Sequence, residues 1–262
     1  MESALAFFAL VLCVVCVETW QRGGKYWVYS NWRRWRAHIA LFLTGSALGS
    51  VLLAGLAVAL LPSLRAAGVG VLVIFPLPWW ALWIVGLLLA DLIDYLWHRS
   101  SHEVPWLWRL HCVHHSDATL DATTTLRGHP VHSLLSSLLS LFWYGAWGIP
   151  SDIVVFRLLL ALVIGVSHHS AVSFIPQHWD RVMNLLVVSP LAHHIHHHNH
   201  PDSYGRNYGS LFSCWDKCFS SWRAPDYAHA PAQLVYGLTD RPATERHGFL
   251  ALLLAPFIKP KS

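Results

Sequence analysis

Long apolar stretches constrain the fold of this chain more than any other feature of its sequence. Residues 38–62 (HIALFLTGSALGSVLLAGLAVALLP) are long enough to cross about 30 Å of hydrocarbon at a rise of about 1.5 Å per residue. Residues 71–97 form a second stretch, and residues 131–169 form a third, which the turn signal GIPSD divides in two. We therefore expect an all-α fold, a polytopic transmembrane helical bundle in which 131–169 is a helical hairpin.

The composition also favours a membrane protein. Hydrophobic residues make up 55% of the chain and charged residues only 12%, which is too apolar for an ordinary soluble domain. Residues 4–17 are a shorter apolar run, expected to be a retained span because they lack the basic start and cleavage site of a secretory signal. The net charge of +4 sits in loops and forms no continuous stripe, so nucleic acid is not expected as a partner.

A basic segment predicts how the bundle is oriented. Residues 21–37 are interpreted as a loop between the first two spans, and positive residues collect on the cytoplasmic side of a membrane. Counting crossings from this loop returns the chain to the cytoplasm after residue 97, and again after residue 169. The basic residues of the loop are Arg22, Lys25, Arg33, Arg34 and Arg36. The histidine-rich segments then fall together on the cytoplasmic face, in a cytosolic helical cap.

Three histidine-rich motifs have spacings typical of metal ligands. HRSSH places two histidines four residues apart, whereas HCVHH and HHIHH both place histidines at i, i+3 and i+4, which is one face of a helix. Neutral imidazole binds divalent transition metals, and such faces on converging helices can surround an ion. The eight residues are His98, His102, His111, His114, His115, His193, His196 and His197. Eight imidazoles are enough for two metal ions, so we predict a dimetal site.

The other histidines and the cysteines are expected to have other roles. His178, His229 and His247 stand alone, and His194, His198 and His200 are expected on other helix faces. The five cysteines are not a regularly spaced set, so no disulfide framework is expected. Cys214 and Cys218 are interpreted as structural residues one helical turn apart, and a metal or redox pair is the less favoured alternative.

The ligand type narrows the chemistry without identifying the metal. Imidazole suits zinc, copper, iron and nickel alike. A structural zinc ion would be enclosed by four ligands, commonly including Cys, and would not need eight histidines. An all-histidine site at the mouth of a transmembrane bundle instead indicates redox chemistry on a substrate within the bilayer. The sequence has no heme, flavin or ferredoxin-like cysteine motif, so the electrons are expected to come from another protein.

The motifs follow one another in a specific order. DLIDYLWHRSSH precedes VPWLWRLHCVHHSD, then come LRGHP and SPLAHHIHHH, and finally NYG and WD. In this order, from about Asp91 to Arg223, they resemble the sterol desaturase and fatty acid hydroxylase superfamily of integral-membrane di-iron enzymes. In that family the histidine motifs bind two irons, which activate O2 with electrons from a separate reductase, cytochrome or ferredoxin and attack a C–H bond of a lipid.

The resemblance implies the eight histidines above as iron ligands, together with further candidates. One more ligand often follows the returning span, where this chain has His168 and His169. HSAV at His169 is similar to the family pattern, but Ala171 stands where the family usually has Asn, so the choice between the two stays open. His129 of RGHP is implied either as a ligand or as a residue that contacts one. His132 stands where the family often has an acidic residue, and it either alters these contacts or faces water.

Other residues near the motifs are expected to support them. Asp91 and Asp94 precede His98 by about two turns and one turn, so each is expected either to accept a hydrogen bond from a metal-binding imidazole or to pair with Arg99. The NYG and WD residues are expected to fold the C-terminal segment over the histidine cap. The expected organisation is 1–70 as N-terminal spans, 71–225 as the catalytic domain and 226–262 as a tail.

These patterns lead to one main functional hypothesis and two alternatives. The main one is a membrane di-iron oxygenase that hydroxylates or desaturates a lipid with O2 and electrons from an external partner; the lipid, its reacting position and the oligomeric state stay open. A metal transporter or storage protein would also use histidines, although a transporter usually binds its ion near the bilayer midplane. A family member without catalysis, acting as a lipid-binding scaffold, is the third.

Overall fold

The structure, a computed structural model, describes residues 2–22, 24–46, 49, 51–171, 175–200, 203, 205–226, 234–238 and 248–258. Within these residues the fold is all-α, as predicted, and an isolated antiparallel bridge joins Val187 to Phe212. The helices are α1 (Glu2–Gln21), α2 (Lys25–Gly45), α3 (Val51–Ala66), α4 (Val71–Ile74), α5 (Trp79–Glu103), α6 (Pro105–His115), η2 (Ala122–Leu126), α7 (Pro130–Trp147), α8 (Ser151–His169), α9 (Gln177–Met183), α10 (Pro190–His196), α12 (Cys214–Cys218), α13 (Phe249–Leu254) and η5 (Ala255–Phe257).

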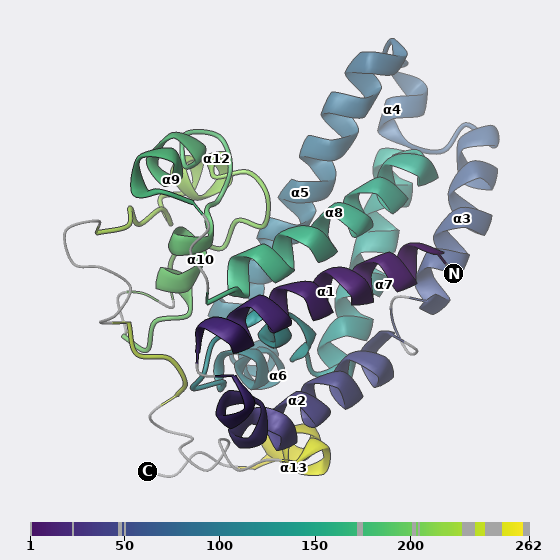
Figure 1. The fold of residues 1–262 in the computed structure, drawn as a ribbon. Coiled ribbons are helices and arrows are strands. Elements are labelled where there is room, and N and C mark those ends of the chain that lie inside the picture. Colours follow the sequence, from purple (N-terminus) through teal and green to yellow (C-terminus); the bar gives the residue numbers. More distant parts are fainter. Residues whose placement is uncertain are drawn as a thin grey trace.

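Among the described residues, three helical segments are long and apolar enough to cross a membrane: Gly55–Ile74, Trp79–Glu103 and Ser151–His169. The last two correspond to the predicted spans at 71–97 and in the second half of the hairpin. In Figure 1 the long helices lie alongside one another, and α6 and α10 lie at the end of the bundle remote from α4. The described chain is therefore an integral membrane protein with short helices grouped at one end.

The structure corrects the predicted boundary between the first two spans. The prediction of a loop over 21–37 and a span over 38–62 is wrong, because α2 covers Lys25–Gly45 as one helix and α3 begins only at Val51. The membrane candidate in this region starts at Gly55 and continues to Ile74. The predicted first span at 4–17 lies within α1, of which Ala9–Gln21 is a shorter apolar helix.

Local sequence signals explain where several helices begin and end. α6, α7 and α10 each begin with Pro, which suits the first helical turn because proline lacks the N–H that would be unpaired there. α7 ends at Gly148, whose φ of 70° is the left-handed conformation that glycine adopts without strain. Gly148 also lies against Gly70. A Cβ added to Gly70 would lie 2.4 Å from the Gly148 Cα, so Gly70 has no room for a side chain. This contact holds the turn after α3 against the tip of the α7–α8 hairpin.

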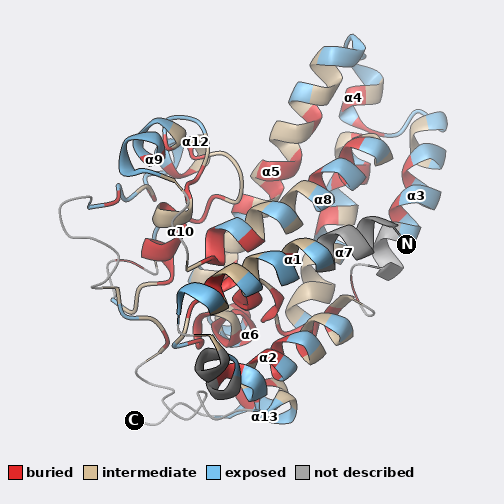
Figure 2. Ribbon diagram, viewed as in Figure 1, coloured by how far each residue is buried: buried red, intermediate tan, exposed pale blue. Residues whose placement is uncertain are grey.

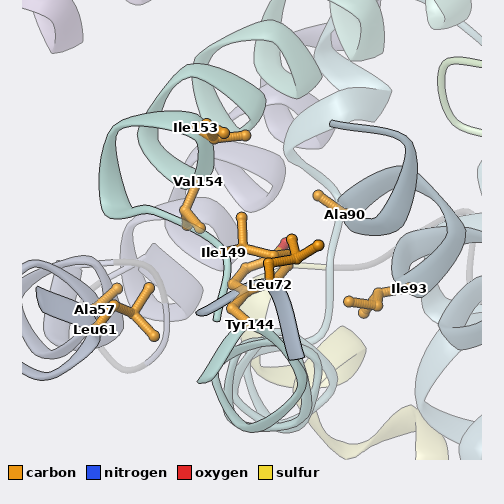
Figure 3. Close-up of a cluster of buried hydrophobic side chains, with 9 residues drawn as sticks. All are labelled: Ala57, Leu61, Leu72, Ala90, Ile93, Tyr144, Ile149, Ile153 and Val154. Carbon is orange, nitrogen blue, oxygen red and sulfur yellow. The ribbon is translucent and has the colours of Figure 1, made fainter. Parts of the chain in front are cut away.

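The main apolar core joins α3, α4, α5, α7 and α8 (Figure 3). Its buried residues are Ala57, Leu61, Leu72, Ala90, Ile93, Tyr144, Ile149, Ile153 and Val154. Because lipid is as apolar as these side chains, the cluster joins the candidate spans through close van der Waals packing and not through exclusion of water. The outward faces of the long helices are exposed, whereas most of α10 is buried or partly buried (Figure 2).

A smaller core attaches the C-terminal helix to the histidine end of the molecule. Leu252 and Ala255 are buried against Ala37 and Leu41 of α2 and Val113 of α6. Leu250, Leu254, Phe257 and Ile258 remain exposed, so α13 and η5 present an apolar outer face. The sequence HGFLALLLAPF, too short for a span, therefore packs one face against the protein.

Candidate metal centre

Five histidines from three helices form the first of two groups. α5 supplies His98 and His102, α6 supplies His111 and His115, and α10 supplies His196. Their ligand nitrogens all lie within 4.8 Å of one another. The i, i+4 spacing on α5 and α6 places both members of each pair on one helix face, so the local sequence accounts directly for the convergence. We call these residues the first histidine group.

Four more histidines form the second group. His114 comes from α6, His169 from α8 and His193 from α10, and His197 is the C-cap residue of α10. The Nε2 atom of His169 lies 3.1 Å from that of His114, 3.2 Å from that of His197 and 3.1 Å from that of His193. Four imidazole nitrogens that meet around one point form a natural ion site. We call these residues the second histidine group.

The two groups are in direct contact. Consecutive residues of α6, His114 and His115, belong to different groups. The rings of His115 and His197, also from different groups, stack with their centroids 4.4 Å apart. Two ions held by these groups would therefore be neighbours within one buried centre.

Hydrogen bonds to main-chain carbonyls determine which ring nitrogen faces each group. Nδ1 of His98 donates to the carbonyl of Tyr208 at 2.8 Å, and Nδ1 of His196 donates to the carbonyl of Arg206 at 2.7 Å. In the second group, Nδ1 of His169 lies 2.7 Å from the carbonyl of Gly165. Because a carbonyl only accepts, Nδ1 holds the proton and the Nε2 lone pair points to the interior of the group.

Burial keeps the imidazoles of α6 and α10 neutral. It lowers the pKa of His114 to about 4, and lowers the pKa of His111, His115, His193, His196 and His197 well below the usual value. A neutral imidazole offers a lone pair, whereas a protonated one does not. At neutral pH these side chains are therefore in the form that binds a metal.

The donor set fits a transition metal. Within the described residues, Nε2 of His111, His115 and His196 and both ring nitrogens of His102 are buried with no hydrogen-bond partner. Buried polar atoms normally have a partner, so their convergence indicates an ion. In the second group the 3.1–3.2 Å separations are close to the roughly 3.3–3.4 Å expected around an ion about 2.0–2.1 Å from four tetrahedral nitrogens. Calcium and magnesium are disfavoured because they prefer oxygen ligands.

Comparison with known proteins places this arrangement in a family. Residues 83–221 match the fatty acid hydroxylase family, and this range covers more than half of the chain and all nine grouped histidines. The chain belongs to the fatty acid hydroxylase family. This confirms the resemblance seen in the order of the motifs. No solved structure matches the chain significantly.

Several curated relatives act on lipids by name. Alkylglycerol monooxygenase of Caenorhabditis elegans is 31% identical over 63% of this chain and 31% of its own length. Ornithine lipid hydroxylase OlsE of Rhizobium tropici is 29% identical over 66% of this chain and 50% of its own length. Cholesterol 25-hydroxylase of Rattus norvegicus is 28% identical over 55% of this chain and 48% of its own length. The match thus spans 31–50% of the length of these longer proteins.

The structure brings nine of the eleven predicted ligands of this fatty acid hydroxylase family member into the two groups and leaves two outside. His129 caps α7, where its Nδ1 accepts from the backbone of Val131 and its Nε2 donates to the carbonyl of Leu253. His168 donates from Nε2 to the carbonyl of Val188 at 3.0 Å, and its ring stacks on that of His193. His169, and not its neighbour, is the α8 residue in the second group.

The isolated histidines lie outside both groups where they are described. His178 and His200 are exposed, and Nδ1 of His198 is bonded to the backbone of Val235. His194 is buried, with Nδ1 3.2 Å from the hydroxyl of Tyr236. His229 and His247 lie outside the described residues. Cys214 and Cys218 are one turn apart on α12, as predicted, and belong to neither group.

The predicted roles of Asp91 and Asp94 are corrected by their partner, Arg157 of α8. Nη2 of Arg157 lies 2.7 Å from Asp91 Oδ1 and 2.8 Å from Asp94 Oδ2, while Arg99 pairs with Glu103. Asp91 also accepts hydrogen bonds from the backbone N–H groups of residues 211 and 212 and from Trp215 Nε1. Sequence reasoning missed Arg157, although an arginine inside an apolar span is itself a signal of a buried partner.

His132 is half-buried and lies beside the first histidine group. Its ring centroid is 4.9 Å from that of His111, and its Nε2 is 2.8 Å from the Ser101 hydroxyl. Because that hydroxyl donates its hydrogen to the carbonyl of Trp97, His132 Nε2 must be the donor. Where the family often has an acidic side chain, this chain therefore has an imidazole that donates a hydrogen bond to Ser101 beside the first histidine group.

A polar network connects α2 to the loop that follows α6. Arg34 pairs with Asp117 at 2.8 Å and with Asp121, and Trp35 Nε1 donates to Asp121. Although burial alone would raise it, the neighbouring Arg34 charge brings the pKa of Asp117 well below its usual range. Within the same loop Arg127 donates to the carbonyl of Val113, and the Arg127 carbonyl lies 3.3 Å from His114 Nδ1. α2, which precedes the matched family region, therefore supports the second histidine group.

Proposed function

We propose that this protein is a membrane di-iron oxygenase that hydroxylates a C–H bond of a lipid. The observation that supports this most strongly is the pair of adjoining, fully histidine-lined groups at the end of the candidate spans α5 and α8. Family membership supports lipid oxidation, and the names of the relatives favour hydroxylation over desaturation. Each hydroxyl group formed consumes one O2, two electrons and two protons, and releases one water.

The nine grouped histidines are the proposed ligands. The first histidine group would hold one iron with five imidazoles, and the second would hold the other with four. When bound, the two irons would supply the chemistry that activates O2 for attack on an unactivated C–H bond. The protein contributes neutral imidazoles, fixed tautomers at His98, His169 and His196, and a buried interior that excludes water from the reacting groups.

The proposed substrate approaches from the bilayer. Exposed apolar side chains cover the outward faces of the candidate spans, among them Ile84 and Leu96 of α5 and Leu158 and Val163 of α8. Leu96 is only two residues from His98, so the lipid-facing surface extends almost to the metal centre. A sterol, an ether lipid and an acyl chain share this apolar character, and lipid is the substrate class that we propose.

The electron donor is proposed to be a separate reductase, cytochrome or ferredoxin on the cytoplasmic side. The described metal candidates are histidine groups, with no cysteine set for an iron–sulfur cluster. Exposed Arg22 directly follows α1, and exposed Arg33 and Arg36 lie in the middle of α2, which Arg34 joins to the loop after α6. Positive residues favour the cytoplasmic side, which supports placing the centre there.

The proposed function is tested by tracing oxygen into lipid. Wild-type protein and the His111→Ala and His193→Ala variants, one for each histidine group, are expressed in a host supplied with iron. Cells are grown under ¹⁸O2, and extracted lipids are compared by mass spectrometry; His178→Ala, at an exposed histidine, is the control. A lipid that gains one ¹⁸O atom only with wild type and the control supports the proposal.

Metal uptake measured in the same cells separates the oxygenase from the metal-transport alternative. If no labelled lipid forms, and if wild-type cells show altered metal uptake that depends on the grouped histidines, the oxygenase proposal fails. The buried position of both groups and their fixed tautomers favour resident metals over ions in transit, since a transporter must also release its cargo.

A further inference from the structure

One asparagine lies at the centre of the backbone segment that holds two residues of the first histidine group. His98 is on α5 and His196 is on α10, yet both donate from Nδ1 to the same short stretch of backbone, at the carbonyls of Tyr208 and Arg206. The residue between these carbonyls is Asn207, which is fully buried. The conformation of this one residue therefore sets the relative position of two hydrogen-bond acceptors.

Asn207 has an unusual backbone conformation. Its φ is 53°, in the left-handed region, where non-glycine residues are uncommon and Asn is among the most tolerant. Residues held in sparsely populated conformations cost about 1–3 kcal/mol and persist only where their surroundings over-determine them. Asn207 lies between two carbonyls, each of which accepts a hydrogen bond from a histidine of the first group. Its unusual conformation therefore indicates that these carbonyls must be held in particular positions.

The side chain of Asn207 supplies the contacts that hold this conformation. Nδ2 donates to the carbonyl of Ala192 on α10 at 3.0 Å and to that of Arg223 at 2.9 Å, while Oδ1 accepts from the Arg223 backbone N–H at 2.7 Å. The Asn207 backbone N–H donates to the carbonyl of Ser221 at 2.9 Å. Asn207 thus attaches the stretch to α10, four residues before His196, and to the segment after α12.

Asp216 fixes the same stretch from its other side. Its carboxylate accepts from the backbone N–H groups of Tyr208 at 2.8 Å and Gly209 at 2.7 Å, and from the Ser221 hydroxyl at 2.6 Å. The carbonyls of Arg206 and Tyr208 are consequently held on both sides of Asn207. In the described part of the chain, Nδ1 atoms of the second histidine group bond elsewhere: that of His169 to Gly165 and Thr125, and that of His114 to Arg127.

From these contacts we infer that Asn207 is a positioning residue specific to the first histidine group. By keeping two carbonyls against Nδ1 of His98 and His196, it directs Nε2 of both rings to the same ion. The inference rests on the proposed dimetal centre. It adds that the two ions depend on different backbone segments, which hold the ligands of the two histidine groups separately. Loss of outer contacts of metal-binding histidines typically weakens metal affinity 10–100-fold. We expect this weakening at one of the two ions only.

The test uses cobalt as the probe in the purified full-length protein. Metal-depleted protein in detergent is titrated with Co²⁺, and visible absorption and a competing chelator report the affinity of each equivalent. Asn207→Ala removes both the tolerant backbone and the side-chain hydrogen bonds, whereas Asn207→Gly removes only the hydrogen bonds. The expected result is that one equivalent binds 10–100-fold more weakly in Asn207→Ala, less so in Asn207→Gly, while the other equivalent is unchanged.

A matched control separates this role from a general effect on folding. Ser220 is also a non-glycine residue with positive φ, at 58°, but it is exposed and its carbonyl meets Arg206 and not a histidine. Ser220→Ala should leave both cobalt equivalents unchanged. Equal weakening of both equivalents in the Asn207 variants, or no weakening, overturns the inference. If the wild-type protein itself takes up fewer than two equivalents, the proposed dimetal centre fails first and the inference falls with it.

Discussion

Asp91 and Arg157 form a buried ion pair, 2.7 Å long, between the two candidate spans that also deliver His98 and His169 to the metal centre. The two residues are 0% and 1% exposed. Asp91 simultaneously binds two backbone N–H groups of the segment that follows Gly209. One carboxylate therefore connects two spans to the segment that covers the first histidine group.

Removing the cation of this pair should destabilise the protein strongly. Arg157→Met leaves Asp91 buried without its positive partner, and breaking one side of a buried pair costs about 3–5 kcal/mol of the free energy of unfolding. Unfolding in mixed detergent micelles measures the loss. Adding Asp91→Asn to the same chain removes the uncompensated charge and should restore part of the stability. Glu103→Gln, which breaks the exposed pair with Arg99, should change stability by at most about 0.5 kcal/mol; a similar effect for both changes would contradict this account.

Neighbouring histidines at the end of α8 should behave differently when replaced. His169→Ala removes an imidazole from the second histidine group, so we expect loss of about half of the bound iron, measured by elemental analysis of purified protein. His168→Ala removes a hydrogen bond to Val188 and a ring stacked on His193, so the protein should keep its full iron content with reduced thermal stability. Equal iron loss in both variants would mean that His168 is also a ligand.

The N-terminal helix α2 should matter for metal binding although it lies outside the matched family region. Arg34→Met leaves Asp117 and Asp121 without their shared cation, and we expect a loss of about 3 kcal/mol or more in the free energy of unfolding. Iron content should fall as well, because the same loop supports His114. Arg36→Met changes the same residue type at an exposed position and should leave both measurements unaltered. A normal iron content in Arg34→Met would separate α2 from the metal centre.

The histidine groups were predictable because their spacing is local. Residues four apart on one helix share a face whatever else the chain does, so His98 with His102 and His111 with His115 could be paired from sequence alone. The choice between His168 and His169 could not be made in this way, because neighbouring residues on a helix point about 100° apart. Only the rotation of α8 against α10 decides which of the two side chains joins the second histidine group, and that rotation is set by packing.

Long-range charge pairing was the other feature that sequence could not supply. Asp91 and Arg157 are 66 positions apart, and Arg34 is 83 positions from Asp117. Arg34 was interpreted as part of a loop that orients the bundle, whereas its partners draw it into the interior as part of a helix. Arg34 is partly buried and ion-paired, so the exposed charges that favour the proposed cytoplasmic side are those of Arg22, Arg33 and Arg36.

Gly209 should not tolerate even one added methyl group. A Cβ at this position would lie 2.8 Å from Asp216 Oδ2, 2.8 Å from a Val188 methyl carbon and 2.9 Å from the Phe212 carbonyl oxygen. Gly209→Ala should therefore cost about 1–3 kcal/mol of unfolding free energy through overpacking. Because the displaced Asp216 also holds Tyr208, the hydrogen bond to His98 should weaken with it. Gly55→Ala, where a Cβ would meet nothing within 4 Å, should instead stabilise α3 by about 0.5–1 kcal/mol. Unfolding of both variants and wild type in detergent measures the expected loss and the expected gain of stability. If Gly209→Ala left the free energy of unfolding unchanged, the segment would be less tightly held than its contacts indicate.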